Sequence, residues 1–231
     1  MNEYETAGSG GYQAALWPFE YVNITAGPNA ANHQISGVSN SGLWDQGWNQ
    51  TQIRRAFAPC DMMLISSRSD GANSQIWRST APVWQPGSAS PAYLTFICSH
   101  SNTLPFTAVG TIISQGTHFY NTGTTGASAY HCHFVLWNGS HGAEIANVVG
   151  YNSYLGQNIY YSTDPPTSIA DMFYLGSTDE AAGSGGYGGQ NFVRWTGGPG
   201  MTIAPLMLYW NKKRRVRNGR STIFVSGSKS I

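Results

Sequence analysis

The sequence predicts an all-β fold, an antiparallel sheet or sandwich with little helix. Charged residues make up only 10% of the 231 residues, well below the usual quarter, while hydrophobic residues make up 41%, enough for a core. The chain has 28 Gly, together with 8 Trp and 13 Tyr. This mixture is typical of short strands joined by tight turns, and it does not favour surface helices rich in Glu, Lys and Ala.

Runs of apolar and β-branched residues, separated by Gly, Pro, Asn and Asp, predict the individual strands. Segments 69–73 and 121–126 are turn-forming breaks of this kind. A short helix is expected near 168–172. The expected strands are 19–24, 62–66, 75–79, 93–100, 111–113, 131–137 and 144–149, with further runs at 192–195, 206–210 and 222–225.

Two similar glycine-rich stretches, AGSGGYQ near the start and AGSGGYGGQ at 182–190, suggest how the chain is divided. Such sequences are typical of flexible linkers. They predict four parts, which are a flexible leader at 1–16, a main domain at 17–178, a Gly-rich linker at 179–190 and a small β accessory segment at 191–231.

Charge is distributed unevenly along the chain. Residues 1–205 carry five basic and eleven acidic residues, and the remainder carries seven basic and no acidic residues, for a total of +1. The basic run Lys212–Arg217 could contact an anionic wall polymer or a larger assembly. It could equally be a solvated strand end that keeps a sheet edge from aggregating. Nucleic acid is not the expected partner.

No stretch approaches the roughly 18 apolar residues of a membrane span, and no signal peptide is visible at the N-terminus. The protein is therefore expected to work inside the cell, to be released by lysis, or to belong to a larger particle. The three cysteines, Cys60, Cys98 and Cys132, are too few for a disulfide framework and are expected to be buried free thiols.

The segment His131-Cys132-His133 carries the first sign of chemistry. On a strand, residues i and i+2 lie on one face, so the two imidazoles are expected side by side and the thiol on the opposite, core face. Two such histidines could share a metal site, one as a ligand and one beside it. By itself the pattern also fits two unrelated surface histidines.

The motifs around this segment resemble those of the lysostaphin/LytM-type zinc peptidases. The resemblance rests on Val109-Gly110 with Ile112-Ile113, on Gly123 and Thr125-Gly126 with Ser128, and on His131-Cys132-His133-Phe134, and it extends to 21–27, 58–61 and 96–100. It covers about residues 17–175 and is similar in style to bacteriophage cell-wall lysins. It implies a LytM-type sheet with long loops that form a groove.

The resemblance implies one Zn²⁺, held by His33, Asp45 and His133, with His100 and His131 as catalytic histidines. Twelve positions separate His33 from Asp45, where the family has a few, so the loop-like insert 36–42 is expected to bulge outward. The chain has no His-Glu-x-x-His motif, so His100 and His131 would orient or deprotonate the attacking water. The remaining histidines, His118 and His141, match no family position.

The function implied is a zinc-dependent endopeptidase that hydrolyses peptide cross-links of bacterial peptidoglycan. It would act on the cell wall as a phage endolysin or a virion-associated lysin. An alternative is a non-catalytic LytM-like module of a phage particle, and another is a sugar-binding or structural β module of a virion. A thiol peptidase using Cys98 or Cys132 is disfavoured, because neither lies in the helix-like sequence that commonly activates such a nucleophile.

Overall fold

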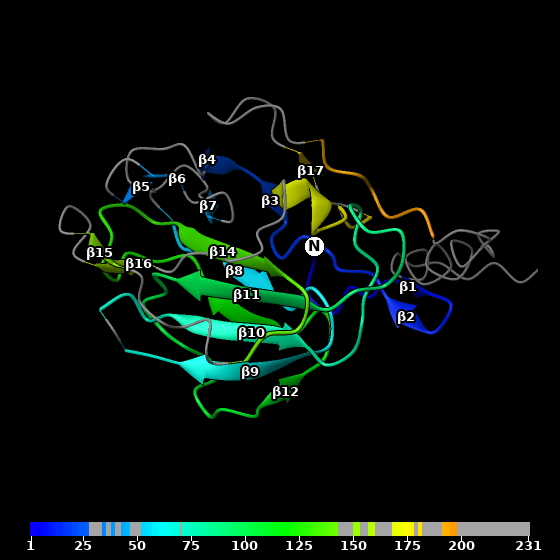
Figure 1. Ribbon diagram of the computed structural model, residues 1–231, viewed down its shortest axis with the longest axis horizontal. Coiled ribbons are helices and arrows are strands. Elements are labelled where there is room, and N and C mark those ends of the chain that lie inside the picture. Colours follow the sequence, from blue (N-terminus) through cyan, green and yellow to red (C-terminus); the bar gives the residue numbers. More distant parts are fainter. Residues whose placement is uncertain are drawn as a thin grey trace, which may run out of the picture.

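The structure is a computed structural model and describes residues 1–27, 34–35, 38–39, 43–46, 52–69, 71–142, 150–152, 157–159, 168–177, 180–181 and 191–197. These residues form an almost entirely β fold, and nearly all strand pairs are antiparallel, as the composition predicted (Figure 1). A short 3-10 helix, η3 (Ile169–Asp171), is capped by the Ser168 side chain and lies where a helix was expected. No helix in the described part of the chain has the length and hydrophobicity to cross a membrane.

The strands are short, and most have two to four residues. In chain order they are β1 (Gly8–Ser9), β2 (Tyr12–Gln13), β3 (Tyr21–Val22), β4 (Ile24–Ala26), β5 (Gln34–Ile35), β6 (Val38–Ser39), β7 (Leu43–Gln46), β8 (Arg55–Phe57), β9 (Met62–Ser67), β10 (Gln75–Ser79), β11 (Leu94–Ser99), β12 (Ile112–Ile113), β13 (His118–Asn121), β14 (Cys132–Asn138), β15 (Gly150–Asn152), β16 (Gln157–Ile159) and β17 (Glu180–Ala181).

The main sheet has seven strands in the order β12-β9-β10-β11-β14-β7-β4, and each neighbouring pair is antiparallel. Its longest strands, β9, β10, β11 and β14, lie where apolar runs predicted strands. Strands β7, β8 and β13 were not predicted, because they are short and mix polar with apolar residues. The expected strands at 144–149, 206–210 and 222–225 lie outside the described residues.

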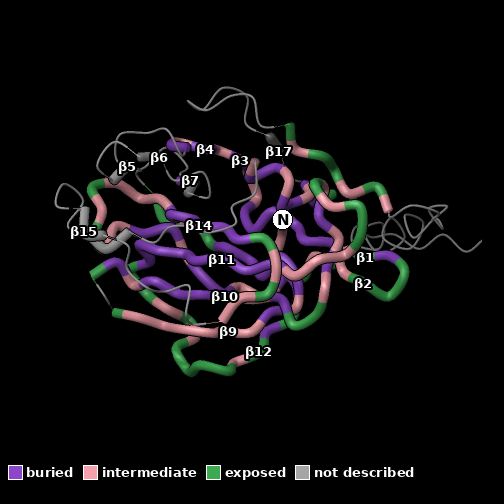
Figure 2. The backbone as a smooth tube through the Cα atoms, viewed as in Figure 1, coloured by how far each residue is buried: buried purple, intermediate pink, exposed green. Residues whose placement is uncertain are grey.

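A small antiparallel pair, β8 with β13, packs on one face of the main sheet and closes the core. The Phe119 ring on β13 lies 5.4 Å from Trp77 on β10 and 6.1 Å from Phe96 on β11, both nearly edge-on. Figure 2 shows the central strands β10, β11 and β14 buried along most of their length. Burial of large aromatic side chains between the two layers accounts for much of the stability.

Residues 1–16 are packed against the core, so the expectation of a flexible leader is wrong. Met1 and Leu16 are wholly buried, and the Leu16 amide donates to the Pro59 carbonyl at 3.0 Å. The glycines of this stretch form a turn and not a linker. Gly10 and Gly11 have φ of 62° and 84° and connect β1 to β2. Glycine adopts this left-handed backbone without strain, which is why a hairpin resembles linker sequence.

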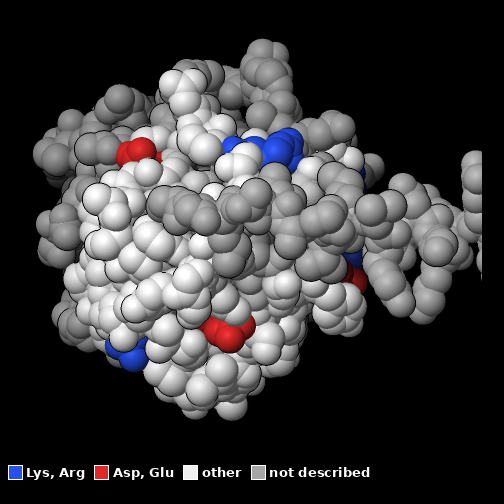
Figure 3. All heavy atoms as spheres, turned by 90° about the vertical axis from the view of Figure 1, so that its right-hand side faces the viewer, with Lys and Arg blue, Asp and Glu red and all other residues white. Residues whose placement is uncertain are grey.

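At the other end, residues 191–197 contact the same core. The Phe192 ring lies 5.2 Å from Trp17, and the Leu175 amide donates to the Val193 carbonyl at 2.8 Å. The Gly-rich stretch 182–190 and the basic run Lys212–Arg217 lie outside the described residues, so the boundary near 179 stays a prediction. Charged side chains are scattered sparsely over the face drawn in Figure 3, in keeping with the low charge content.

The core centres on Trp17, which is wholly buried and contacts four aromatic rings at 5.2–6.1 Å. Trp17→Ala is therefore expected to lower the free energy of unfolding by about 3–5 kcal/mol, because the cavity it leaves cannot collapse. Tyr12→Ala, at a side chain that is 44% exposed, should cost less than about 1 kcal/mol. Urea unfolding of both variants measures the difference, and equal losses would contradict this account of the core.

Candidate metal centre

Four titratable side chains converge where three neighbouring strands of the main sheet, β11, β14 and β7, end side by side. Asp45 lies on β7, His133 lies on β14, His131 immediately precedes β14 and His100 immediately follows β11. In the sheet β14 lies between the other two strands, with His133 opposite Asp45 on one side and opposite Ser99 on the other. Pairing of three strands that are distant in sequence therefore brings the four residues together.

The alternation expected for His131-Cys132-His133 is confirmed. The ring centroids of His131 and His133 lie 4.6 Å and 5.4 Å from that of His100, so both imidazoles face the same site. Cys132 is wholly buried and belongs to the hydrophobic core on the opposite face. One strand therefore supplies polar groups to the site and an apolar thiol to the core.

His100 reaches the site through an unusual backbone conformation. Strict alternation along β11 would place the His100 side chain on the core face with Cys98, on the opposite side of the sheet from His133. Instead His100 has φ of +85°, in the left-handed region that only a few non-glycine residues adopt. The turn redirects the imidazole to the site, and the strain is held by a 2.6 Å hydrogen bond from the His100 amide to the Ala72 carbonyl.

One ligand nitrogen from each of the three histidines lies within 4.8 Å of the other two, and the carboxylate of Asp45 lies beside them. Oδ1 of Asp45 lies 2.9 Å from Nδ1 of His133, and Oδ2 lies 3.8 Å from Nε2 of His131. Asp45, His100 and His133 are buried, and His131 is partly exposed. The site is thus shielded on most sides and opens to solvent at His131.

Backbone carbonyls fix the tautomers of two of these histidines. Nδ1 of His100 lies 2.8 Å from the Thr125 carbonyl oxygen, and Nδ1 of His131 lies 2.8 Å from that of Ala129. A carbonyl only accepts hydrogen bonds, so each Nδ1 carries a proton, and in the neutral form each ring presents the lone pair of Nε2 to the site. A histidine that contacts a metal or its bound water is usually oriented by such a hydrogen bond from its other ring nitrogen.

Burial, and after it the nearby His133 and His131, lower the pKa of His100 to about 3. The Thr125 carbonyl and Asp45 act in the opposite direction, but they do not outweigh the loss of hydration. His100 is therefore neutral at physiological pH and keeps its Nε2 lone pair available.

Three imidazoles and a carboxylate form a donor set that suits Zn²⁺, which prefers nitrogen and oxygen ligands in a tetrahedral arrangement. The site needs no rearrangement of the backbone to present them, because all four side chains already point to one region. The described residues thus fit the metal that the sequence predicts.

The structure brings together four of the five residues predicted for the site, Asp45, His100, His131 and His133. The fifth, His33, lies outside the described residues. In the insert that follows it, the backbones of β5 and β6 pair as a small antiparallel ladder, and the outward bulge of the insert stays a prediction. Sequence reasoning missed the carbonyls of Thr125 and Ala129, because main-chain acceptors leave no residue-type signal.

The other two histidines that the structure describes lie away from the cluster. Nε2 of His118 contacts the Asn121 side chain at 3.0 Å, and Nε2 of His141 contacts the Asn138 carbonyl at 2.8 Å.

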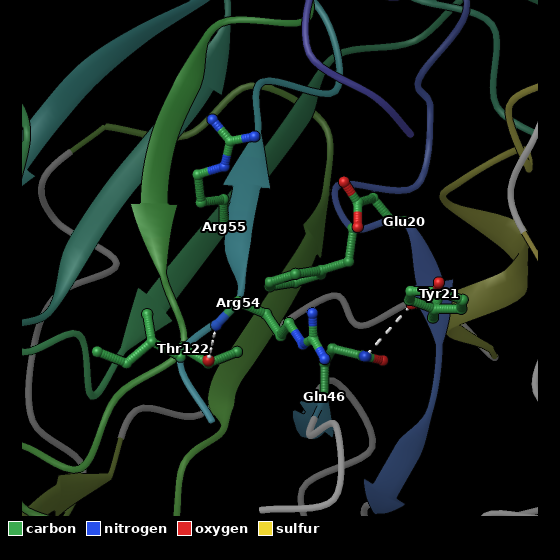
Figure 4. Close-up of a pocket in the computed structure, with 8 residues that line it drawn as sticks. Glu20, Tyr21, Gln46, Arg54, Arg55 and Thr122 are labelled. Atoms are coloured by element: carbon green, nitrogen blue, oxygen red, sulfur yellow. Dashed lines mark hydrogen bonds between the residues drawn. The ribbon is translucent and has the colours of Figure 1, made fainter. Parts of the chain in front are cut away.

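A cavity of about 220 Å³ lies near the site but contains none of its histidines. Gln46 in its wall directly follows Asp45 on β7, so the two side chains point to opposite faces of that strand. Figure 4 shows the Gln46 amide directed to Tyr21 and the Arg54 backbone held by Thr122. The cavity lining is Phe19, Glu20, Tyr21, Gln46, Ile53, Arg54, Arg55 and Thr122.

No protein-family model matches the sequence. Among solved structures, the chain is similar to a zinc-containing peptidase from Vibrio cholerae, with 15% sequence identity and a TM-score of 0.38 over 67% of this chain. The chain spans 44% of the length of that structure. A likeness this distant carries no weight for function, which rests on the geometry of the chain's own residues.

The metal-free protein is expected to lose stability as the pH falls from about 6.5 towards 3. The folded state keeps His100 neutral down to about pH 3, whereas the unfolded chain binds this proton near pH 6.5, so stability rises with pH in this window. His100→Asn removes the proton and tolerates the left-handed backbone. Urea unfolding at about pH 6 and pH 4 gives the free energy of unfolding at each pH. Between these two values it should fall more steeply in the wild type than in the variant, by about 1.4 kcal/mol per pH unit. Parallel slopes would contradict the buried neutral state.

Proposed function

We propose that the protein is a zinc-dependent endopeptidase of the lysostaphin/LytM type that hydrolyses peptide cross-links of bacterial peptidoglycan. The observation that supports it most is the convergence of Asp45, His100, His131 and His133 at one sheet edge. These residues occupy the positions that the family motifs assign to a zinc ligand pair and two catalytic histidines. The domain proposed to carry this activity is 17–178, now with residues 1–16 packed on it.

The proposed ligands are Asp45, His133 and, from the family resemblance, His33. Two ligands bonded at about 2.1 Å in a tetrahedral site are roughly 3.4 Å apart. Oδ1 of Asp45 and Nδ1 of His133 are 2.9 Å apart, which is about 0.5 Å less than that separation. Three protein ligands leave a fourth position for water, as a catalytic zinc site requires.

Zinc, when bound, supplies a Lewis acid that polarises the scissile carbonyl and lowers the pKa of water. The two remaining histidines divide the proton chemistry by their burial. Nε2 of the buried His100 accepts a hydrogen bond and orients the attacking water, since its low pKa makes it a poor proton store. Nε2 of His131, at the solvent-facing side, accepts the proton that the attacking water loses and then donates it to the leaving amine.

The substrate part of the proposal comes from the family resemblance. Its members cut glycine-containing bridges or D-Ala-linked stem peptides. The protein would act on the cell wall, either released by lysis or carried on a phage particle. A contact of Lys212–Arg217 with an anionic wall polymer or with the particle belongs to the same proposal.

Substitution of the paired histidines should separate binding from catalysis. His133→Ala is expected to lose the metal, because it removes a ligand and leaves the Asp45 carboxylate beside a gap. His131→Ala should retain about one zinc per chain while turnover falls about 10²–10⁴-fold, the usual effect of losing a general acid–base group. Elemental analysis and turnover on peptidoglycan measure both. Equal zinc content with equal residual activity would overturn the division of roles.

Digestion of peptidoglycans that differ in cross-bridge type tests the reaction itself. Fragments identified by mass spectrometry should show one class of peptide bond cut, no cleavage with a chelator, and recovery when zinc is restored. A His141→Ala variant, changed at a histidine outside the cluster, is the matched control and should cleave normally. Zinc binding without cleavage of any peptidoglycan would instead favour the non-catalytic module of a phage particle.

A further inference from the structure

Two loops meet beside His100, and Thr125 clamps this histidine with both of its backbone groups. The Thr125 amide donates to the His100 carbonyl at 3.1 Å, and the Thr125 carbonyl accepts from Nδ1 of His100 at 2.8 Å. The position of one peptide segment therefore determines both the backbone and the ring of His100. Whatever holds Thr125 in place also sets which nitrogen His100 presents to the site.

The side chain of Asn102 is the group that holds this segment. Its Oδ1 accepts from the Thr124 amide at 2.8 Å, from the Thr124 hydroxyl at 3.3 Å and from the Thr125 hydroxyl at 3.2 Å. Asn102 is itself exposed, two residues beyond His100. A single surface oxygen thus gathers three donors of the loop that supplies the clamp.

The same loop reaches the second candidate catalytic histidine through Gly123. The Gly123 amide donates to the His131 carbonyl at 3.0 Å, and the His131 amide donates to the Gly123 carbonyl at 3.1 Å. A Cβ at position 123 would collide with the His100 carbonyl oxygen and the Asn102 amide. The loop therefore lies directly against the backbone of residues 100–102, and only glycine fits at position 123.

We propose that Asn102 is a positioning residue, which acts through Thr125 to hold His100 in the Nδ1–H tautomer with Nε2 directed to the metal centre. The inference rests on the proposed function for the consequence in catalysis, but not for the tautomer. Without Oδ1 of Asn102, the three donors of Thr124 and Thr125 turn to water, and the carbonyl that fixes the ring is no longer constrained. Outer groups of this kind typically change activity 10–100-fold.

The test compares Asn102→Ala with Asn102→Asp, whose carboxylate restores the acceptor, and with Asn138→Ala, an exposed asparagine at the end of β14. Long-range ¹H–¹⁵N spectra of the histidine rings in the metal-free full chain report the tautomer directly. The His100 signal is assigned by its loss in His100→Asn. Zinc content, kcat and KM on peptidoglycan are measured on the zinc-loaded proteins.

Asn102→Ala is expected to give mixed tautomers at His100 and a kcat about 10–100-fold lower, with zinc content, KM and thermal stability nearly unchanged. Asn102→Asp should recover both the single tautomer and the wild-type kcat, and Asn138→Ala should match wild type.

A single unchanged tautomer in Asn102→Ala overturns the proposal, and so does failure of Asn102→Asp to restore the single tautomer. If Asn102→Ala does not fold, Asn102→Leu keeps the side-chain shape without the acceptor and decides in the same way. A wild-type chain without zinc or turnover would refute the proposed function alone, since the tautomer is read without metal.

Discussion

The pairing of β14 with β11 on one side and β7 on the other is the constraint on which the site depends. It places His133 directly opposite Asp45, although 87 residues of chain separate them. Because side chains alternate along a strand, a slip of one residue in this register would send the histidines into the core and the core residues out. The aromatic side chain of Phe134, which follows His133 and packs against Trp17, opposes such a slip. Core packing therefore determines the geometry of the site.

The site also depends on backbone strain that its surroundings hold in place. His100 adopts a conformation disfavoured for a side chain with a Cβ, and its hydrogen bonds with the backbones of Ala72 and Thr125 keep it there. The loop that carries Thr125 is itself held against His131 by two backbone hydrogen bonds of Gly123. Two of the histidines are thus coupled through the main chain as well as through their rings, and neither ring orientation is set by its own strand alone.

The sequence predicted the fold class and the long central strands from strong local patterns, and it predicted the four residues that converge from weaker patterns taken together. Strand alternation predicted the shared face of His131 and His133, and motif order pointed to Asp45 and His100. It did not predict that Asp45 lies on a strand, since Leu43–Gln46 is short and flanked by Trp, Gly and Asn. The packed residues 1–16 were missed because the glycines of a tight hairpin resemble those of a linker. The main-chain clamp at Thr125 follows from tertiary contact and has no signature in the residues themselves.

The placement of Cys132 between the two histidines bears on which ions the centre can accept. A thiolate in the cluster would make it softer and favour copper(I) or a closed, sulfur-rich structural zinc site. Strand alternation instead turns this sulfur into the core, where it lies beside Cys98, and burial together with that neighbour raises the pKa of the Cys98 thiol. Both sulfurs are kept from the cluster by a single backbone geometry. The cluster thereby keeps a harder set of nitrogen and oxygen donors, although a thiol lies within one peptide unit of it.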